Sequence, residues 1–223
     1  MGWATFERAK FTSFADFQDA KFTYAVNFQG VEFTRGTYFQ NTTFDSFIDF
    51  RGAKFTGGDT DFRGAKFAGK TYFWDARFTG TTDFRRVSFT GDTDFWGATF
   101  GGRTDFQGVT FGDRADFTGV TFGDRADFTG ARFSDYVVFG ETEDQFRARQ
   151  THEGRQTTNT KSKGAKFEKS PSFDGPSQFT QLPKFKGTQF PTCPTLTDDS
   201  EPQDFFAGAI LLDEQDIKDN PTP

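Results

Sequence analysis

Phenylalanine recurs along most of this chain at intervals that alternate between five and six residues. The pattern starts at Phe6, takes in one extra residue near Gly57 and Gly58, and continues to Phe139. It includes 25 of the 35 phenylalanines of the chain. Neither the 3.6-residue period of a helix nor the two-residue period of a long strand produces such steps. The pattern therefore predicts short extended segments joined by tight turns.

A second apolar row lies two residues before each of these phenylalanines. The side chain there is nearly always small or β-branched, as at Ala9, Val31 and Ala98. Because residues two apart in an extended segment share a face, both rows are expected to point inward. The residue between them is expected to point into water, and it is often an acid or a base. Replacing such a residue, for example Asp83 or Asp105, should then cost little stability.

Three-residue units carry a family resemblance. Ala15-Asp16-Phe17, Ala115-Asp116-Phe117 and Ala126-Asp127-Phe128 resemble the motif of pentapeptide-repeat proteins, which is a small residue, Asp or Asn, Leu or Phe, and two variable residues. The resemblance is strong over residues 4–139 and weak over residues 164–190. It implies an all-β fold, a right-handed quadrilateral β-helix with four units per coil and with the phenylalanine and the small residue inside. Four alternating units make coils of 22 residues, so about six coils should stack into a rod roughly 30 Å long.

The pattern also divides the chain into segments. The expected segments are a pentapeptide-repeat solenoid over residues 1–139, a polar helix or linker excursion over 140–163, a returning repeat coil over 164–190, and an acidic tail over 191–223. Within the excursion, only residues 141–150 have the composition of a short helix.

Both ends of such a rod need attention, because a terminal coil exposes unpaired backbone and aromatic rings. The tail has one apolar segment, residues 204–212, that could cap the last coil or form a dimer contact. Its candidate residues are Phe205, Phe206, Ile210, Leu211 and Leu212. At the other end, residues 1–5 are too few to cover the first coil, which invites pairing with another chain. A homo-oligomer is therefore expected, either a dimer or an end-to-end assembly.

Charge narrows the choice of partners. The net charge of −6 belongs mainly to the tail, since residues 1–139 carry 18 acids and 16 bases. Some members of the family that this chain resembles mimic duplex DNA and act on type II topoisomerases through a long acidic rod. The near-neutral charge of residues 1–139 makes DNA mimicry only a weak alternative here. Nucleic-acid binding is not expected, because acids outnumber bases and no groove of basic and aromatic residues is evident.

The sequence offers little for catalysis or for membrane insertion. Its only histidine, His152, lies in the polar excursion, and its only cysteine, Cys193, cannot form an internal disulfide. No phosphate-binding loop is present. No apolar run approaches the roughly 20 residues of a membrane span. The chain is therefore expected to be a cytoplasmic protein that is not an enzyme and that has no cofactor, no metal site and no membrane partner.

Three aromatic residues stand out on the expected surface. With 22 residues per coil, Trp74 and Trp96 occupy the same outward position in successive coils, and Tyr72 lies beside Trp74. Tryptophan is enriched in recognition hot spots, although these rings could instead stack on each other and shield the coil. The sequence thus favours a non-catalytic scaffold that presents a rigid surface to an unidentified protein. The alternative is an element that assembles end to end into filaments.

Overall fold

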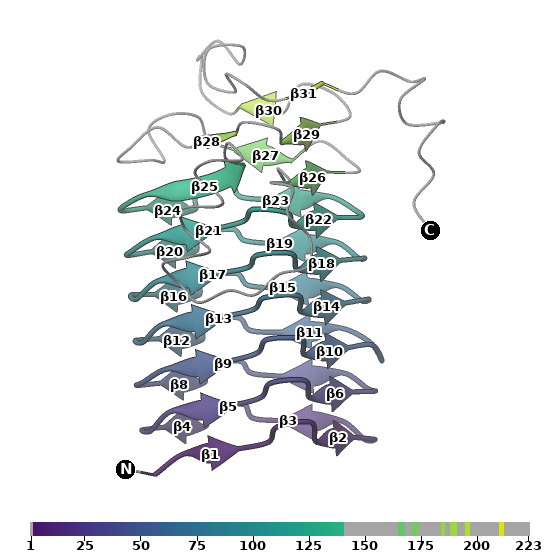
Figure 1. The fold of residues 1–223 in the computed structure, drawn as a ribbon, viewed down its shortest axis with the longest axis vertical. Helices are drawn as coiled ribbons and strands as arrows, with labels where there is room; N and C mark the ends of the chain where they lie inside the picture. The colour runs from purple at the N-terminus through teal and green to yellow at the C-terminus, as the bar shows by residue number, and fades with distance from the viewer. Residues whose placement is uncertain are drawn as a thin grey trace, which may run out of the picture.

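The chain winds into a four-sided β-solenoid whose strands are only two residues long over most of its length (Figure 1). This computed structural model describes residues 2–140, 165–167, 171–173, 184–185, 188–190, 195–196 and 210–211. The helix expected over residues 141–150 lies outside the described residues. Four parallel sheets form the sides of the rod, and about six coils stack between Ala4 and Gly140. The expected quadrilateral β-solenoid is thereby confirmed.

The four sides follow one another along the chain and are called faces 1 to 4. Face 1 consists, in spatial order, of β1 (Ala4–Thr5), β5 (Val26–Asn27), β9 (Ile48–Asp49), β13 (Thr71–Tyr72), β17 (Thr93–Asp94), β21 (Ala115–Asp116), β25 (Val137–Gly140) and β28 (Lys184–Phe185). Face 2 consists of β2 (Lys10–Phe11), β6 (Glu32–Phe33), β10 (Lys54–Phe55), β14 (Arg77–Phe78), β18 (Thr99–Phe100), β22 (Thr121–Phe122), β26 (Lys166–Phe167), β29 (Gln189–Phe190) and β31 (Ile210–Leu211).

The two remaining sides are built in the same way. Face 3 consists of β3 (Ala15–Asp16), β7 (Thr37–Tyr38), β11 (Thr60–Asp61), β15 (Thr82–Asp83), β19 (Thr104–Asp105), β23 (Ala126–Asp127), β27 (Ser172–Phe173) and β30 (Thr195–Leu196). Face 4 consists of β4 (Lys21–Phe22), β8 (Thr43–Phe44), β12 (Lys66–Phe67), β16 (Ser88–Phe89), β20 (Thr110–Phe111) and β24 (Arg132–Phe133). Among the described residues, face 4 is the shortest side.

The register follows the spacing of the sequence. Ala4 pairs with Val26, a step of 22 residues, whereas Thr37 pairs with Thr60, a step of 23. The extra residue is taken up at Gly57 and Gly58. A Cβ on Gly57 would overlap the backbone of the coil beneath it, and Gly58 has a φ of 130°. Two glycines are therefore what allows the longer coil to close without breaking the stack.

Phenylalanine rings fill the interior, as expected. Every phenylalanine of the pattern from Phe28 to Phe139 is buried. Rings in successive coils stack face to face, as in Phe62 and Phe84, whose centroids are 4.9 Å apart with an interplanar angle of 1°. Neighbouring columns meet edge to face, as in Phe62 and Phe73 at 5.9 Å and 82°. Both geometries suit the charge distribution of aromatic rings and stabilise the core beyond simple burial.

The expectation that the acidic rows are solvated was wrong for much of faces 1 and 3. Asp49, Asp94, Asp105, Asp116 and Asp127 are 1–7% exposed. Each points outward from the core but turns back toward its own corner, where its Oδ1 accepts the backbone N–H of the residue two positions later. The preceding and the following coil, each one strand spacing away, then cover the carboxylate on both sides. The acid is thus a cap for the turn, which explains why an Asp or Asn occupies this position.

The basic rows behave as expected. On face 2, Lys54 and Arg77 are exposed, and on face 4, Lys66 and Arg132 are exposed. These long side chains extend into water instead of capping the corner. The rod therefore has two sides on which many acids are covered, which alternate with two sides that carry exposed bases and half-buried threonines.

Beyond Gly140 the described strands add to the same faces. The Phe167 ring stacks on Phe122 at 4.7 Å, and the Phe190 ring stacks on Phe167 at 5.0 Å. β31 pairs with β29 on face 2. Within the described part of the chain, no helix has the length and apolar character needed to cross a membrane.

Candidate interaction surface

Two of the three predicted surface aromatics form a stacked pair. Tyr72 ends β13, and Trp74 follows two residues later on the same side of the rod. Their ring centroids are 4.8 Å apart with an interplanar angle of 29°. Both side chains are half-buried, so the expected fully exposed aromatics are instead packed flat against the coil. A flat, preordered pair of rings loses little entropy when a partner covers it.

Trp96 lies one coil further on. Tyr72 pairs with Asp94 in the register of face 1, so Trp74 and Trp96 occupy equivalent positions. Trp96 is also half-buried, and its backbone N–H donates to Asp94 Oδ1 at 2.9 Å. The three predicted residues therefore lie on one side of the rod, in two successive coils.

Arg51 belongs to this surface and was missed in the sequence. Its guanidinium carbon lies 5.4 Å from the centroid of Trp74 and 6.0 Å from that of Tyr72. The same guanidinium donates to both carboxylate oxygens of Asp49, and this hydrogen bonding raises the pKa of Arg51 above its ordinary value. A cation held over two rings fixes their position and adds cation–π attraction. The signal was available, because Arg51 precedes Trp74 by one 23-residue coil.

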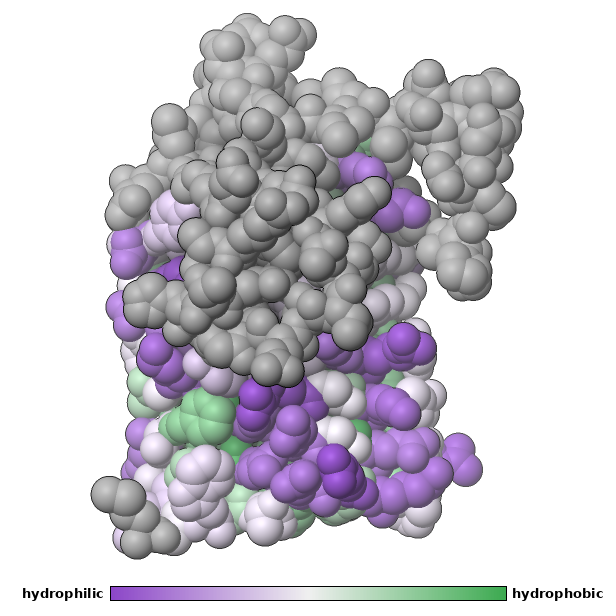
Figure 2. Space-filling model, in the orientation of Figure 1, coloured by the Kyte–Doolittle hydropathy of each residue, from purple (hydrophilic) through white to green (hydrophobic). Residues whose placement is uncertain are grey.

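Two further rings extend this surface toward the first coil. Phe47 meets Tyr72 edge to face at 5.3 Å, and Trp3 meets Phe47 at 6.2 Å. We call Trp3, Phe47, Tyr72, Trp74 and the overlying Arg51 the aromatic strip. Figure 2 shows a green, hydrophobic area low on the visible face, in the region where Figure 1 has β5 and β9, beside purple, hydrophilic side chains. The aromatic strip is thus longer than the predicted pair and shifted toward the start of the chain.

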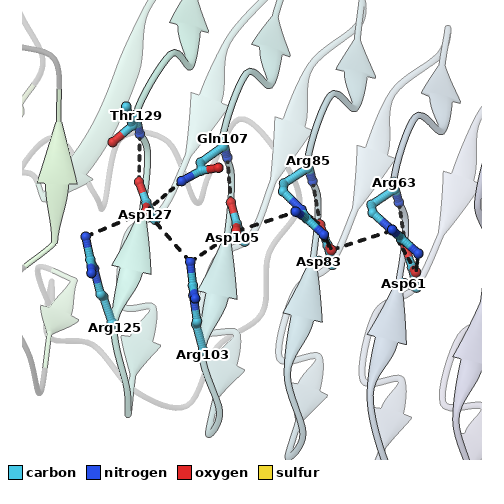
Figure 3. A network of polar contacts seen from close by, with 10 residues as sticks. All are labelled: Asp61, Arg63, Asp83, Arg85, Arg103, Asp105, Gln107, Arg125, Asp127 and Thr129. Carbon is cyan, nitrogen blue, oxygen red and sulfur yellow. Dashed lines mark hydrogen bonds and ion pairs between the residues drawn. The ribbon is translucent and has the colours of Figure 1, made fainter.

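The opposite side, face 3, carries an acid–base ladder along β11, β15, β19 and β23 (Figure 3). Arg63 and Arg85 each bind the aspartate two residues earlier, with Nη2 to Oδ2 distances of 2.6 Å to Asp61 and Asp83. Each arginine also reaches the aspartate of the next coil, at 3.6 Å from Arg63 to Asp83 and at 3.9 Å from Arg85 to Asp105. Every carboxylate of this part of the ladder therefore lies close to a cation, and the row does not present a bare acidic surface.

The last two rungs of the ladder differ in their ionisation. Burial raises the pKa of Asp105 above its usual value, and the nearby carboxylates of Asp83 and Asp127 raise it further. Burial also acts to raise the pKa of Asp127, but hydrogen bonds from Thr129 and Gln107 outweigh it and hold that pKa below its usual value. Gln107 Nε2 donates to Asp127 Oδ2 at 2.9 Å. Two aspartates of the same row in adjacent coils thus have opposite pKa shifts. The hydrogen bonds from Thr129 and Gln107 outweigh the effect of burial at Asp127, whereas burial dominates at Asp105.

A groove of about 680 Å³ runs along face 3 beside this ladder. Its walls include Gln40, Arg63, Arg85 and Arg86, and its remaining lining residues are glutamine, asparagine and glycine. No nucleophile, histidine or carboxylate lines the groove. The groove can therefore donate hydrogen bonds but lacks the groups needed for acid–base or nucleophilic chemistry.

The other candidates from the sequence fall mostly outside the described residues. This is so for His152, Cys193, Phe205, Phe206 and Leu212. Ile210 and Leu211 are described only as strand β31, which adds to face 2 beyond β29. Across the described ranges, no three His, Cys, Asp or Glu residues form a group that could hold a metal ion.

Comparison with known proteins identifies a repeat family. The family model described as pentapeptide repeats (9 copies) matches residues 17–64, 57–99 and 95–143, which together cover more than half of the 223 residues. No curated protein matches this chain. No solved structure matches it either.

Proposed function

Because this chain belongs to the pentapeptide-repeat family, we propose that it is a non-catalytic scaffold that presents the aromatic strip of face 1 to a protein partner. Members of this family are β-solenoids and are generally not enzymes. The observation that carries the proposal is the chain of ring contacts from Trp3 through Phe47 and Tyr72 to Trp74, held on a rigid lattice.

The chemistry of the strip favours a protein partner. Tryptophan, tyrosine and arginine are the residue types most enriched in binding hot spots. All three occur here within one contact cluster, and the Arg51 charge is already compensated by Asp49. A small anion would gain little from such a compensated arginine. Apolar or aromatic side chains of a partner would gain the buried area of the rings.

DNA mimicry receives less support. A mimic of duplex DNA needs an unpaired acidic surface, whereas the acids of faces 1 and 3 cap corners and approach arginines. A second candidate, self-association through an end of the rod, is favoured by the open first coil, in which the phenylalanines are only partly buried.

The test of the scaffold proposal is a matched comparison of surface variants. The double variant Y72S/W74S removes the centre of the aromatic strip. Tyr38 is the outward residue of β7 on face 3 and occupies the same position in its strand as Tyr72 does on face 1. Tyr38→Ser therefore serves as the control. We expect proteins that co-purify with the unmodified chain, quantified by mass spectrometry, to be lost with Y72S/W74S and retained with Tyr38→Ser. Equal recovery with both variants would contradict the proposal.

A further inference from the structure

The coil formed by residues 4–22 is open on one side. Strands β1, β2, β3 and β4 each stand at the end of their sheet, so four strand edges face the same direction. Figure 1 shows these four strands together at the N-terminal end of the rod. Open edges of this kind pair readily with another chain.

Apolar side chains collect at the same end. The large hydrophobic residues that are exposed in the described part of the chain are Trp3 at 59%, Phe14 at 69% and Tyr24 at 65%. The partly buried members of the core are Ala4, Phe6, Ala9, Phe11, Phe17 and Phe22, all of which belong to this coil. An apolar end of this size on an otherwise polar rod marks an interaction surface.

The positions of the exposed rings and charges restrict how two such ends can meet. Trp3 and Tyr24 lie at the corner between faces 4 and 1, because they flank β1 and follow β4. Phe14 lies at the diagonally opposite corner, between β2 and β3. Among the outward charges of this coil, Lys10 is on face 2, Asp16 is on face 3 and Lys21 is on face 4.

We propose that the first coil is the contact between two copies of this chain, which meet head to head about a two-fold axis through opposite corners of the coil. Either diagonal axis places aromatic corners against aromatic corners. Each also places Asp16 of one copy opposite a lysine of the other, either Lys10 or Lys21. An axis through the middle of a face gives neither the aromatic contacts nor the contact between Asp16 and a lysine. It sets the aromatic corners against polar corners, and lysine against lysine.

The first coil is complementary to a second copy of itself, because the diagonal arrangement sets its aromatic corners against each other and its Asp16 against a lysine of the same surface. A self-complementary contact of this kind closes into a dimer instead of propagating into a filament. The pair would present Phe47, Tyr72, Trp74 and Arg51 of the aromatic strip twice, which raises the avidity for a multivalent partner.

The proposal is tested by measuring the mass of the full chain in solution over a range of concentrations, by sedimentation or light scattering. We expect a dimer for the unmodified chain. The triple variant W3S/F14S/Y24S should raise the dissociation constant at least about a hundredfold. The variant Y72S/W74S should remain a dimer, which separates this contact from the scaffold proposal. A monomer at all concentrations, or rods of variable length, would overturn the head-to-head pair.

A charge exchange tests the geometry independently of folding. The variants K10E/K21E and D16K should each dimerise poorly, because each sets like charges against one another across the contact. Mixed in equal amounts, they should form a mixed dimer, since the opposite charges meet again. The absence of any mixed dimer, with both variants folded by circular dichroism, would contradict the head-to-head contact of the first coils.

Discussion

The first coil and the middle coils of the rod are made of the same repeat unit but differ in how much of it is covered. In the middle coils, between residues 28 and 122, every phenylalanine of the pattern is buried and stacks between the rings of the coils on either side, as Phe73 does between Phe50 and Phe95. In the first coil, Phe6 stacks on Phe28 at 4.8 Å but has no ring beneath it among the described residues. The difference shows that a repeat unit obtains its stability from its neighbours and only secondarily from its own sequence.

The largest expected difference between the two regions concerns a buried ring. Phe84→Ala should lower the free energy of unfolding by about 3–5 kcal/mol, because it leaves a cavity between two stacked rings. Phe6→Ala should cost roughly half as much, since that site has one covered side and can relax into water. Urea denaturation of both variants measures this difference. Equal losses would mean that coverage by the next coil is not what stabilises the unit.

A smaller difference is expected at the capping acids. Asp127→Ala should cost about 2 kcal/mol, because it leaves the half-buried backbone N–H of Thr129 without its acceptor and removes the buried carboxylate that Gln107 binds. Asp16→Ala removes the same cap in the first coil, but there water can replace the acceptor, and the cost should stay below about 1 kcal/mol. Thermal unfolding of the two variants checks the order. A cheaper Asp127→Ala would support the solvated acidic row that the sequence had suggested.

The pH dependence distinguishes two covered acids within the middle coils. The pKa of Asp127 is lowered in the folded state, so its contribution to stability is present above its unfolded pKa and is lost as pH falls through the folded value. The pKa of Asp105 is raised, so its ionisation opposes folding as pH rises through the folded value.

Substitution by asparagine, which keeps an acceptor for the corner, isolates the charge. At pH 7, Asp127→Asn should destabilise the rod, whereas Asp105→Asn should be neutral or slightly stabilising. As the pH falls through the lowered folded pKa of Asp127, the effect of Asp127→Asn should shrink, because the unmodified carboxyl then loses its charge as well. Parallel pH profiles for both variants would contradict the opposite shifts.

The smallest effect is expected on the outer surface. Trp74→Ser removes a half-buried ring from the aromatic strip but no part of the phenylalanine core, so the melting temperature should fall by only a few degrees. Partner capture should fall much more. A loss of stability as large as that of Phe84→Ala would indicate that Trp74 is structural.

The regular part of this fold was predictable because a strict spacing leaves few alternatives. Once phenylalanines such as Phe84 and Phe106 recur every 22 residues, the inward rows, the coil length and the extra residue at Gly57 follow from geometry. The burial of Asp127 did not follow, because it depends on how closely adjacent coils pack over an outward side chain. Spacing within one unit contains no information about that distance.

The candidate surface was predictable only in part, for a related reason. Tyr72, Trp74 and Trp96 occupy regular outward positions, so their shared side could be inferred. Phe47 and Trp3 lie at corners, 44 residues apart and therefore two coils apart, where the repeat motif places variable residues. Their contact depends on the small side chain of Ala25, which lies between them in the stack. The positions of the aromatic residues alone do not reveal this contact.

The most direct test of coverage by neighbouring coils is amide hydrogen exchange on the dilute, monomeric chain. The N–H of Phe6 donates to Asn27 O at 2.7 Å, and the N–H of Phe84 donates to Asp105 O at the same 2.7 Å, so bond length does not distinguish them. If coverage sets local stability, the Phe6 amide should exchange at least about a hundredfold faster than the Phe84 amide. Equal protection of the two amides would contradict this account of the rod.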